Sequence, residues 1–419
     1  MYVLLDGIGD LPCPDLNNLT PLEAANTPNL DIIAQNGISG EVTSVGKGIA
    51  PQSDIAVFNM LGYNFKDNNY VGRGVVECLG CNIDFKEGDL ALRGNFATID
   101  SNKKIIDRRA GRIISKDDAS EICDIINKNV TIDNIEIFVK PTIGHRVILH
   151  FRKKNCNLGE NITNTDPAYD KINGIGVAKS NSENEIYVIN SKYHNKESKS
   201  SAEIVNTFSD QVIKLLNDCE VNKRRIIKGL LPINCILLRD AGNRYPRIQS
   251  INDKYQLNFA SLVDMPVEIG ISKILGMASY ECGGPSDYEL KAKTLLNILK
   301  DHEFFYVHIK GPDEFGHDGD AKGKKKNIEE IDERFFKPLQ EGFSKLKNME
   351  VCYIISGDHS TPCIKKAHTD DPIPLLVSGK NIANDSTSRF TEIYSSKGNM
   401  GKILGYEVID CSLNVLNNR

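Results

Sequence analysis

Three short apolar runs, each followed closely by an aspartate, place the strongest constraint on how this chain folds. The runs and their aspartates are Tyr2–Leu5 with Asp6, Phe304–Ile309 with Asp313, and Val351–Ile355 with Asp358. Runs of this length that end in glycine-containing loops are typical of buried strands. A helical pattern follows the first run, and another separates the last two. Strands that alternate with helices predict an α/β fold with a mostly parallel sheet and helices on both faces.

The aspartates that follow these runs are expected to lie together. In open α/β sheets, ligands bind in the crevice outside the carboxyl ends of the strands. Histidines accompany two of the aspartates, and His317 comes four residues after Asp313, on the same face of a helical turn. His359 directly follows Asp358, and His368 comes nine residues later. The pattern therefore predicts one site with three carboxylates and three imidazoles.

This set of side chains indicates a site for two metal ions. Carboxylate oxygens and imidazole nitrogens together suit Mn²⁺, Zn²⁺, Fe²⁺ or Co²⁺, and Mg²⁺ fits less well where histidines dominate. Paired ions clamp the attacking and leaving oxygens of a phosphoryl transfer. Ser53, at the expected start of a helix, is a candidate nucleophile because a base or a metal can activate its hydroxyl. A plain helix-capping serine is the alternative interpretation of this residue.

Charge and composition exclude other broad classes of protein. The 419 residues carry a formal net charge of −5, so neither nucleic acid nor a membrane surface is an expected partner. The first residues lack the basic start of a signal peptide, and no apolar run reaches the roughly 18 residues of a membrane span. The CxxC pair Cys78 and Cys81 has no second pair to complete a zinc site. We therefore expect reduced thiols and a cytoplasmic protein.

The length of the chain favours two domains over a single core. The amino-acid composition changes between about 76 and 265. Within this range, the segment Phe151–Ser201 is rich in Asn, Lys and Ser. An alternating strand is expected within it, at Glu185–Ile189. Both ends of the chain contribute to the expected metal site. We therefore expect a discontinuous metal-binding domain of residues 1–75 and 266–419, with residues 76–265 inserted into it.

Long stretches of the chain resemble one known family. They include LTPLEAANTPNLDIIAQNGISG (19–40), GRGVVECLGCNIDFKEGDLALRGNFATID (72–100), GHRVILHF (144–151), VNKRRIIKGLLPINCILLRDAG (221–242) and AHTDDPIPLLVSG (367–379). With these motifs the chain resembles the archaeal-type cofactor-independent (2,3-bisphosphoglycerate-independent) phosphoglycerate mutases of the alkaline phosphatase superfamily. The motif GDHSTPC followed by a histidine and DPxP is highly specific, whereas DGxGD alone is weak.

The resemblance implies a fold, an activity and a set of metal ligands. The fold would be an alkaline-phosphatase-like sheet domain with an inserted α/β substrate-binding domain. The activity would be the interconversion of 3-phosphoglycerate and 2-phosphoglycerate in glycolysis and gluconeogenesis, without 2,3-bisphosphoglycerate and through a phosphoserine at Ser53. Two divalent ions would be bound. Mn²⁺ is the expected metal, with Zn²⁺, Co²⁺ or Mg²⁺ as alternatives. The implied ligands of one ion are Asp313, His317 and His368, and those of the other are Asp6, Ser53, Asp358 and His359.

The implied mechanism also needs cations that bind a carboxylate and a phosphate, for which the arginine fork is well suited. The candidates in the inserted domain are Arg108, Arg109, Arg112, His145, Arg146 and Arg239, with Arg73 at the domain junction. A surface ion pair is the alternative for any single arginine. Closure of the inserted domain over the metals would exclude water, which otherwise hydrolyses a phosphoserine.

The sequence departs from the family pattern around the nucleophile. Gln52 stands where the family usually has glycine, and Ile55-Ala-Val57 replaces Thr-Ala-His. Glu268-Ile269 stands where a basic residue is expected. The expected metal set is complete, so these changes concern the choice of substrate. The alternatives are a metal-dependent phosphatase or phosphodiesterase of the same superfamily, and a protein with a non-catalytic metal site. For the enzymes the expected partner is a small molecule, with homo-oligomerisation left open.

Overall fold

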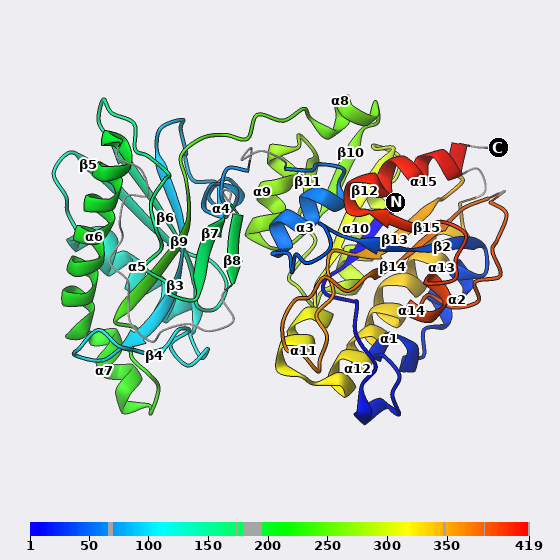
Figure 1. The fold of residues 1–419 in the computed structure, drawn as a ribbon, viewed down its shortest axis with the longest axis horizontal. Coiled ribbons are helices and arrows are strands. Elements are labelled where there is room, and N and C mark those ends of the chain that lie inside the picture. The colour runs from blue at the N-terminus through cyan, green and yellow to red at the C-terminus, as the bar shows by residue number, and fades with distance from the viewer. Residues whose placement is uncertain (66–69, 173–174, 179–194, 347–348, 381, 418–419) are drawn as a thin grey trace. The chain divides into compact units, whose positions relative to one another are not determined.

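The chain divides into two structural units, each built around its own β-sheet (Figure 1). The first unit comprises Met1–Phe65 and Gln249–Arg419, and the second comprises Lys66–Ile248. The computed structural model describes residues 1–65, 70–172, 175–178, 195–346, 349–380 and 382–417. Both junctions lie earlier in the chain than the expected positions 76 and 265. The strand expected at Glu185–Ile189 falls outside the described residues.

The first unit contains an eight-stranded sheet with the strand order β11-β10-β12-β1-β13-β14-β2-β15. Its strands are β1 (Tyr2–Leu5), β2 (Gly37–Thr43), β10 (Phe259–Leu262), β11 (Ala278–Tyr280), β12 (Phe304–Ile309), β13 (Tyr353–Gly357), β14 (Ile373–Ser378) and β15 (Gly401–Leu404). The strands pair in parallel except at β14, which is antiparallel to both of its neighbours. The mostly parallel sheet is confirmed. Strand β13 begins two residues later than the predicted run.

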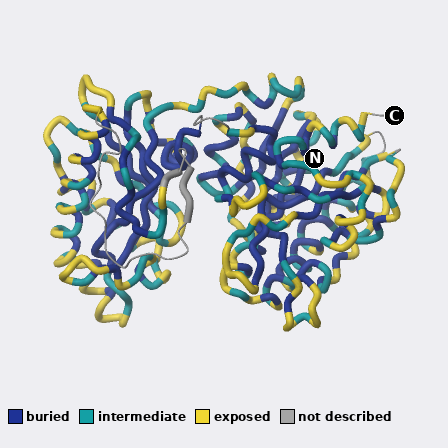
Figure 2. Tube along the Cα trace, viewed as in Figure 1, coloured by how far each residue is buried: buried dark blue, intermediate teal, exposed yellow. Residues whose placement is uncertain are grey.

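Helices cover this sheet on both faces. They are α1 (Pro21–Ala24), α2 (Pro28–Ala34), α3 (Ser53–Met60), α8 (Ile251–Tyr255), α9 (Pro266–Ile274), α10 (Tyr288–Ile298), α11 (Pro312–Asp318), α12 (Ala321–Ile331), α13 (Lys337–Phe343), α14 (Glu392–Ser395) and α15 (Val408–Asn417), with a π-helical turn at Asp332–Phe336. Val3 and Leu5 of β1 pack in one core with Leu30 of α2 and Leu295 of α10. Helix α15 lies on the opposite side of the sheet from α12 and α13 (Figure 1). Figure 2 shows the strands buried between these layers.

The second unit contains a five-stranded antiparallel sheet. Its strands are β3 (Leu90–Ile99), β4 (Ile105–Asp107), β5 (Ile135–Pro141), β6 (Arg146–Lys153) and β9 (Cys235–Gly242). Strand β3 pairs with β4, β6 and β9, which makes it the centre of the sheet. A separate hairpin joins β7 (Tyr169–Ile172) and β8 (Ile175–Ala178).

The helices of the second unit leave part of one sheet face to polar side chains. They are α4 (Arg73–Gly80), α5 (Lys116–Asn129), α6 (Lys196–Asn217) and α7 (Glu220–Ile227). On one face, Leu92 packs in a core with Ile122 of α5 and Phe208 of α6. On the other, Val75 of α4 packs against Ala91. Because side chains alternate along a strand, Arg93 shares this second face with Ala91.

Candidate active site

Three side chains from separate segments converge beyond the carboxyl ends of β1 and β13. Asp6 directly follows β1, and Asp358 and His359 directly follow β13. His359 Nε2 lies 3.5 Å from Asp6 Oδ1 and 3.4 Å from Asp358 Oδ2. All three residues are buried. Because β1 and β13 are adjacent parallel strands, their ends deliver these groups to one point.

A second group adjoins the first and shares His359 with it. Asp313 and His317 lie on α11, which follows β12, and His317 Nε2 is 3.6 Å from Asp313 Oδ1. His368 Nε2 is 3.4 Å from the same oxygen and 3.2 Å from His317 Nε2. The ligand atoms of Asp313, His359 and His368 all lie within 4.8 Å of one another. The structure therefore brings together the carboxylates and imidazoles that the sequence pattern singled out.

Each of the three imidazoles is held through Nδ1. His368 Nδ1 lies 2.7 Å from the Pro51 carbonyl oxygen, and His317 Nδ1 lies 3.2 Å from that of Lys366. A carbonyl only accepts, so both Nδ1 atoms carry the proton. The Thr361 hydroxyl donates to Asp313 Oδ1 at 2.6 Å and so accepts from His359 Nδ1 at 3.0 Å. All three Nε2 atoms therefore carry a lone pair that a metal can bind.

Ser53 stands at the first position of α3, beside these groups. Its Oγ lies 3.3 Å from His359 Nε2. The N-cap of α3 is Gln52, and no side chain caps the helix. The interpretation of Ser53 as a plain capping serine is therefore wrong. Its position at a helix N-terminus also leaves backbone N–H groups free to face an anion.

Buried oxygens in this cluster fit a divalent cation. Asp6 Oδ1 and Asp358 Oδ2 are among the buried side-chain atoms of the described residues that have no hydrogen-bond partner. Burial and the neighbouring Asp6 raise the pKa of Asp358 to about 7. Two unsatisfied carboxylate oxygens in a buried place are costly unless a cation compensates them. The donor set of carboxylates and imidazoles suits the divalent ions named above.

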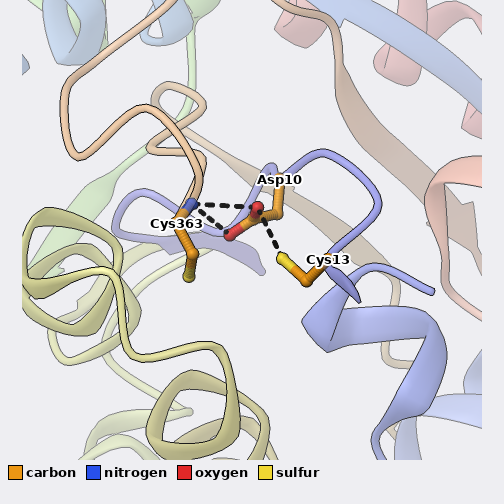
Figure 3. A group of neighbouring side chains, drawn as sticks. All are labelled: Asp10, Cys13 and Cys363. Carbon is orange, nitrogen blue, oxygen red and sulfur yellow. Dashed lines mark hydrogen bonds between the residues drawn. The ribbon is translucent and has the colours of Figure 1, made fainter. Parts of the chain in front are cut away.

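Asp10, Cys13 and Cys363 form another group of potential ligands (Figure 3). Asp10 faces Cys13 and the backbone N–H of Cys363, which donates to Asp10 Oδ1 at 3.1 Å. The buried ammonium of Lys324 lies 2.8 Å from Asp10 Oδ2. Burial raises the pKa of the Cys13 thiol to about 11. These contacts tie the loop after β1 to the loop after β13, and we interpret them as structural.

The second unit holds a cluster of buried arginines. Arg93 of β3 and Arg239 of β9 are direct cross-strand partners, so two like charges lie on one sheet face. Glu77 of α4 compensates part of this charge, because its Oε1 lies 2.6 Å from Arg73 Nε and 3.4 Å from Arg93 Nε. Burial and the nearby Arg73 lower the pKa of Arg93 to about 9. Guanidinium groups of like charge are therefore buried close together in this cluster.

Asp166 and Tyr169 extend this cluster. The Asp166 carboxylate is fully buried, accepts from Arg239 Nη1 at 3.1 Å, and also pairs with Arg108. The guanidinium of Arg239 lies 3.8 Å from the centroid of the Tyr169 ring, which is a cation–π contact. Together these contacts fix the fork of Arg239 in one orientation.

The remaining substrate-binding candidates border the same cluster. Burial, together with Arg146 and Arg109, lowers the pKa of His145 to about 3, so this imidazole is neutral at pH 7. Arg109 and Arg112 are exposed, unlike Arg73, Arg93 and Arg239.

Sequence reasoning missed several members of this cluster. Arg93, Asp166 and Tyr169 were not singled out. Arg93 lies within the buried strand Leu90–Ile99, and a charged residue inside a buried strand is a signal that could have found it. Asp166 and Tyr169 lie in a loop and a hairpin with no comparable pattern.

Comparison with known proteins agrees with this description. The family model for 2,3-bisphosphoglycerate-independent phosphoglycerate mutase matches residues 34–222. A protein of that name from Aeropyrum pernix is 36% identical, over 99% of this chain and 99% of its own length. Another from Methanocaldococcus jannaschii is also 36% identical, over 98% of this chain and 96% of its own. The chain belongs to the 2,3-bisphosphoglycerate-independent phosphoglycerate mutase family.

Solved structures place the fold in the same family. The cofactor-independent phosphoglycerate mutase from Thermoplasma acidophilum matches with a TM-score of 0.63 and 29% identity, over 99% of this chain and 98% of its own. A protein from Pyrococcus horikoshii matches with a TM-score of 0.78 and 28% identity, over 100% of this chain and 97% of its own. Among the described residues we find no helix with the length and hydropathy of a membrane span.

Proposed function

We propose that this member of the mutase family interconverts 3-phosphoglycerate and 2-phosphoglycerate without 2,3-bisphosphoglycerate, through a phosphoserine at Ser53. The observation that carries the proposal is the position of the Ser53 hydroxyl. It lies 3.3 Å from His359 Nε2, at a helix N-terminus and beside carboxylates with unsatisfied oxygens. The family supports the same activity, since its curated relatives are named as mutases.

The proposal includes two divalent ions, with Mn²⁺ as the expected metal. Asp313, His317 and His368 would hold one ion, and Asp6, Ser53, Asp358 and His359 the other. When bound, the ions supply positive charge that favours the deprotonated serine and offsets the charge of a transferring phosphoryl group. The outward N–H groups of the three histidines keep their Nε2 atoms directed at these positions.

The chain's own residues then transfer the group in two steps. In the first, a bond forms between Ser53 Oγ and phosphorus while the bond to the substrate's 3-oxygen breaks. The proton of the serine ends on that oxygen, which gives glycerate. In the second, the 2-hydroxyl of the glycerate takes the phosphoryl group, and its proton returns to Ser53. Water takes no part in either step. The ratio of 2-phosphoglycerate to free phosphate therefore distinguishes this reaction from hydrolysis.

The arginine cluster is the proposed holder of the substrate's anionic groups. Its arginines include Arg73, Arg93, Arg108 and Arg239, which pair with the carboxylates of Glu77, Asp166 and Asp240. A phosphoglycerate carries one carboxylate and a phosphate of nearly two negative charges, and cationic side chains complement both groups. Arginine forks also suit both groups geometrically.

We further propose that the protein works in the cytoplasm. All eleven of its cysteines are free thiols, and most are buried. Reduced thiols are the rule in that compartment.

The test is a coupled enolase assay of the purified chain with 3-phosphoglycerate and Mn²⁺, without 2,3-bisphosphoglycerate. Released phosphate is followed in parallel. The proposal expects 2-phosphoglycerate with little free phosphate, and loss of activity after chelation. Free phosphate alone would instead identify a hydrolase and would point to Gln52, Ile55 and Val57.

A further inference from the structure

Lys310 is a lysine that lies between two carboxylates at the edge of the candidate metal site. It follows β12, and its side chain is 13% exposed. Its Nζ lies 2.9 Å from Asp6 Oδ2 and 2.6 Å from Oε1 of Glu268, which is buried on α9. Neither Lys310 nor Glu268 belongs to the proposed ligand set.

The contact with Lys310 gives the two carboxylate oxygens of Asp6 different surroundings. Oδ2 is taken by the ammonium, whereas Oδ1 faces His359 Nε2 at 3.5 Å. Oδ1 has no hydrogen-bond partner among the described residues. Lys310 therefore holds the carboxylate in one rotation, with a single oxygen directed toward Asp358 and His359.

The lysine is itself held in place on several sides. The Tyr288 hydroxyl donates to the Lys310 carbonyl oxygen at 3.0 Å, and the buried Lys291 donates to the His308 carbonyl oxygen at 2.7 Å. Glu268 anchors the ammonium from α9. Backbone and side chain are thus both fixed, as orientation of a metal ligand from outside requires.

We infer that Glu268 and Lys310 form a positioning pair that presents Asp6 to a divalent cation through Oδ1 alone. This inference rests on the proposed function, because it assumes that Asp6 is a metal ligand. It assigns a purpose to Glu268, which stands where the family resemblance led us to expect a basic residue. The basic group here comes from another segment, the end of β12.

A simple charge effect makes the opposite prediction for Lys310. Removing a positive charge beside a cation site strengthens cation binding by Coulomb's law. Loss of a positioning group weakens it, typically by about 10-fold to 100-fold for partners of metal ligands. The double variant Lys310→Met/Glu268→Gln removes one charge of each sign and so isolates positioning from net charge.

The experiment is calorimetric titration of Mn²⁺ into the full chain, with circular dichroism to verify folding. We expect the Kd of the Asp6 position to rise about tenfold or more in the double variant. Lys310→Arg keeps a positive charge that can contact Asp6, so its Kd for Mn²⁺ should stay near that of the wild type. The matched control is Lys337→Met/Glu333→Gln, an exposed pair with the same change in charge, which should have no effect.

The outcomes separate this inference from the function on which it rests. A double variant that binds Mn²⁺ as tightly as the wild type overturns the positioning role alone. A wild type that binds no Mn²⁺ overturns both proposals. If the double variant does not fold, Lys310→Met decides by the sign of its effect: weaker binding supports positioning, and tighter or unchanged binding contradicts it.

Discussion

The candidate carboxylate and imidazole ligands of the first unit stand in loops or on a short helix that follow strands, whereas the arginines of the second unit stand largely within strands and on a helix. Asp6 and Asp358 follow β1 and β13, where adjacent parallel strands end together. Arg93 and Arg239 face one another in the middle of an antiparallel sheet. The first arrangement collects negative charge and imidazoles, and the second collects positive charge. The comparison shows that sheet topology decides where groups from distant segments meet.

The two clusters also differ in how their charge is compensated. In the first unit, buried carboxylate oxygens lack partners, which fits an added cation. In the second, like-charged arginines lie close together and share the carboxylates of Glu77 and Asp166, which fits an added anion. If this division is correct, variants in one cluster should change chemistry or metal binding, and variants in the other should change substrate affinity or local stability.

The largest expected effect is that of Ser53→Ala. Removal of the nucleophile should lower kcat by about 10⁴-fold or more, as for other enzymes that lose their nucleophile. The fold and Mn²⁺ binding at Asp313, His317 and His368 should remain. The coupled assay and a Mn²⁺ titration measure both properties. Near-wild-type turnover in this variant contradicts the phosphoserine mechanism.

Glu77→Gln should destabilise the second unit. The substitution leaves Arg73 and Arg93 without their shared carboxylate, and breaking a buried ion pair costs about 3 kcal/mol. Burial opposes ionisation of Glu77, but attraction to Arg93 and Arg73 lowers its pKa from 4.5 to about 2. Its contribution is therefore present above pH 4.5 and is lost as the pH falls toward 2.

Hydrogen exchange resolved by mass spectrometry measures this effect in each unit separately. The chain has no tryptophan, so its fluorescence offers no simple alternative. The matched control is Glu220→Gln, which breaks an exposed pair with Lys223. If the amides of β3 and β9 are equally protected from exchange in the wild type and in Glu77→Gln, this carboxylate does not have the structural role that we assign to it.

Glu392 in the first unit should show the opposite pH dependence. Its carboxyl accepts from the Thr20 hydroxyl at 2.8 Å, and burial raises its pKa from 4.5 to about 7. The stability that it contributes is complete below pH 4.5 and is lost as the pH rises from 4.5 through 7, by about 3 kcal/mol. Glu392→Gln should flatten that slope in urea unfolding curves followed by circular dichroism. An unchanged slope would show that Glu392 is ionised in the folded protein at pH 7.

The smallest effect is expected for Arg239→Lys, which keeps the charge but loses the fork. The variant should raise the KM for 3-phosphoglycerate about tenfold, because a lysine cannot reproduce the stacking on Tyr169 and the contact with Asp166 together. Binding of Mn²⁺ should not change. Arg224→Lys, at an exposed pair with Glu121, is the control. A change in Mn²⁺ affinity would contradict the division between the clusters.

Much of the first unit follows from its sequence pattern. The runs before Asp6, Asp313 and Asp358 are strands β1, β12 and β13, and helices separate them. An apolar run and the aspartate that follows it are local signals in the sequence. Parallel pairing then brings the carboxyl ends of these strands together. The antiparallel β14 carries no signal of its direction, since a buried apolar run has the same pattern in either orientation.

The rest depends on contacts between distant segments. Glu268 looked like a mismatch in the sequence, yet it pairs with Lys310, which lies on another element. The pairing of Arg93 with Arg239 depends on the register of β3 and β9, which the hydrophobic pattern of either strand alone does not determine. Charged pairs of this kind are therefore found from the structure and not from spacing.

The central claim is that Ser53 carries the phosphoryl group between the two positions of the substrate. The most direct measurement is mass spectrometry of peptides from enzyme that is acid-quenched during turnover of 3-phosphoglycerate. The account predicts phosphate on the peptide that contains Ser53, and none on it in Ser53→Ala. Full turnover with that peptide unmodified, or phosphate on another residue, would contradict it.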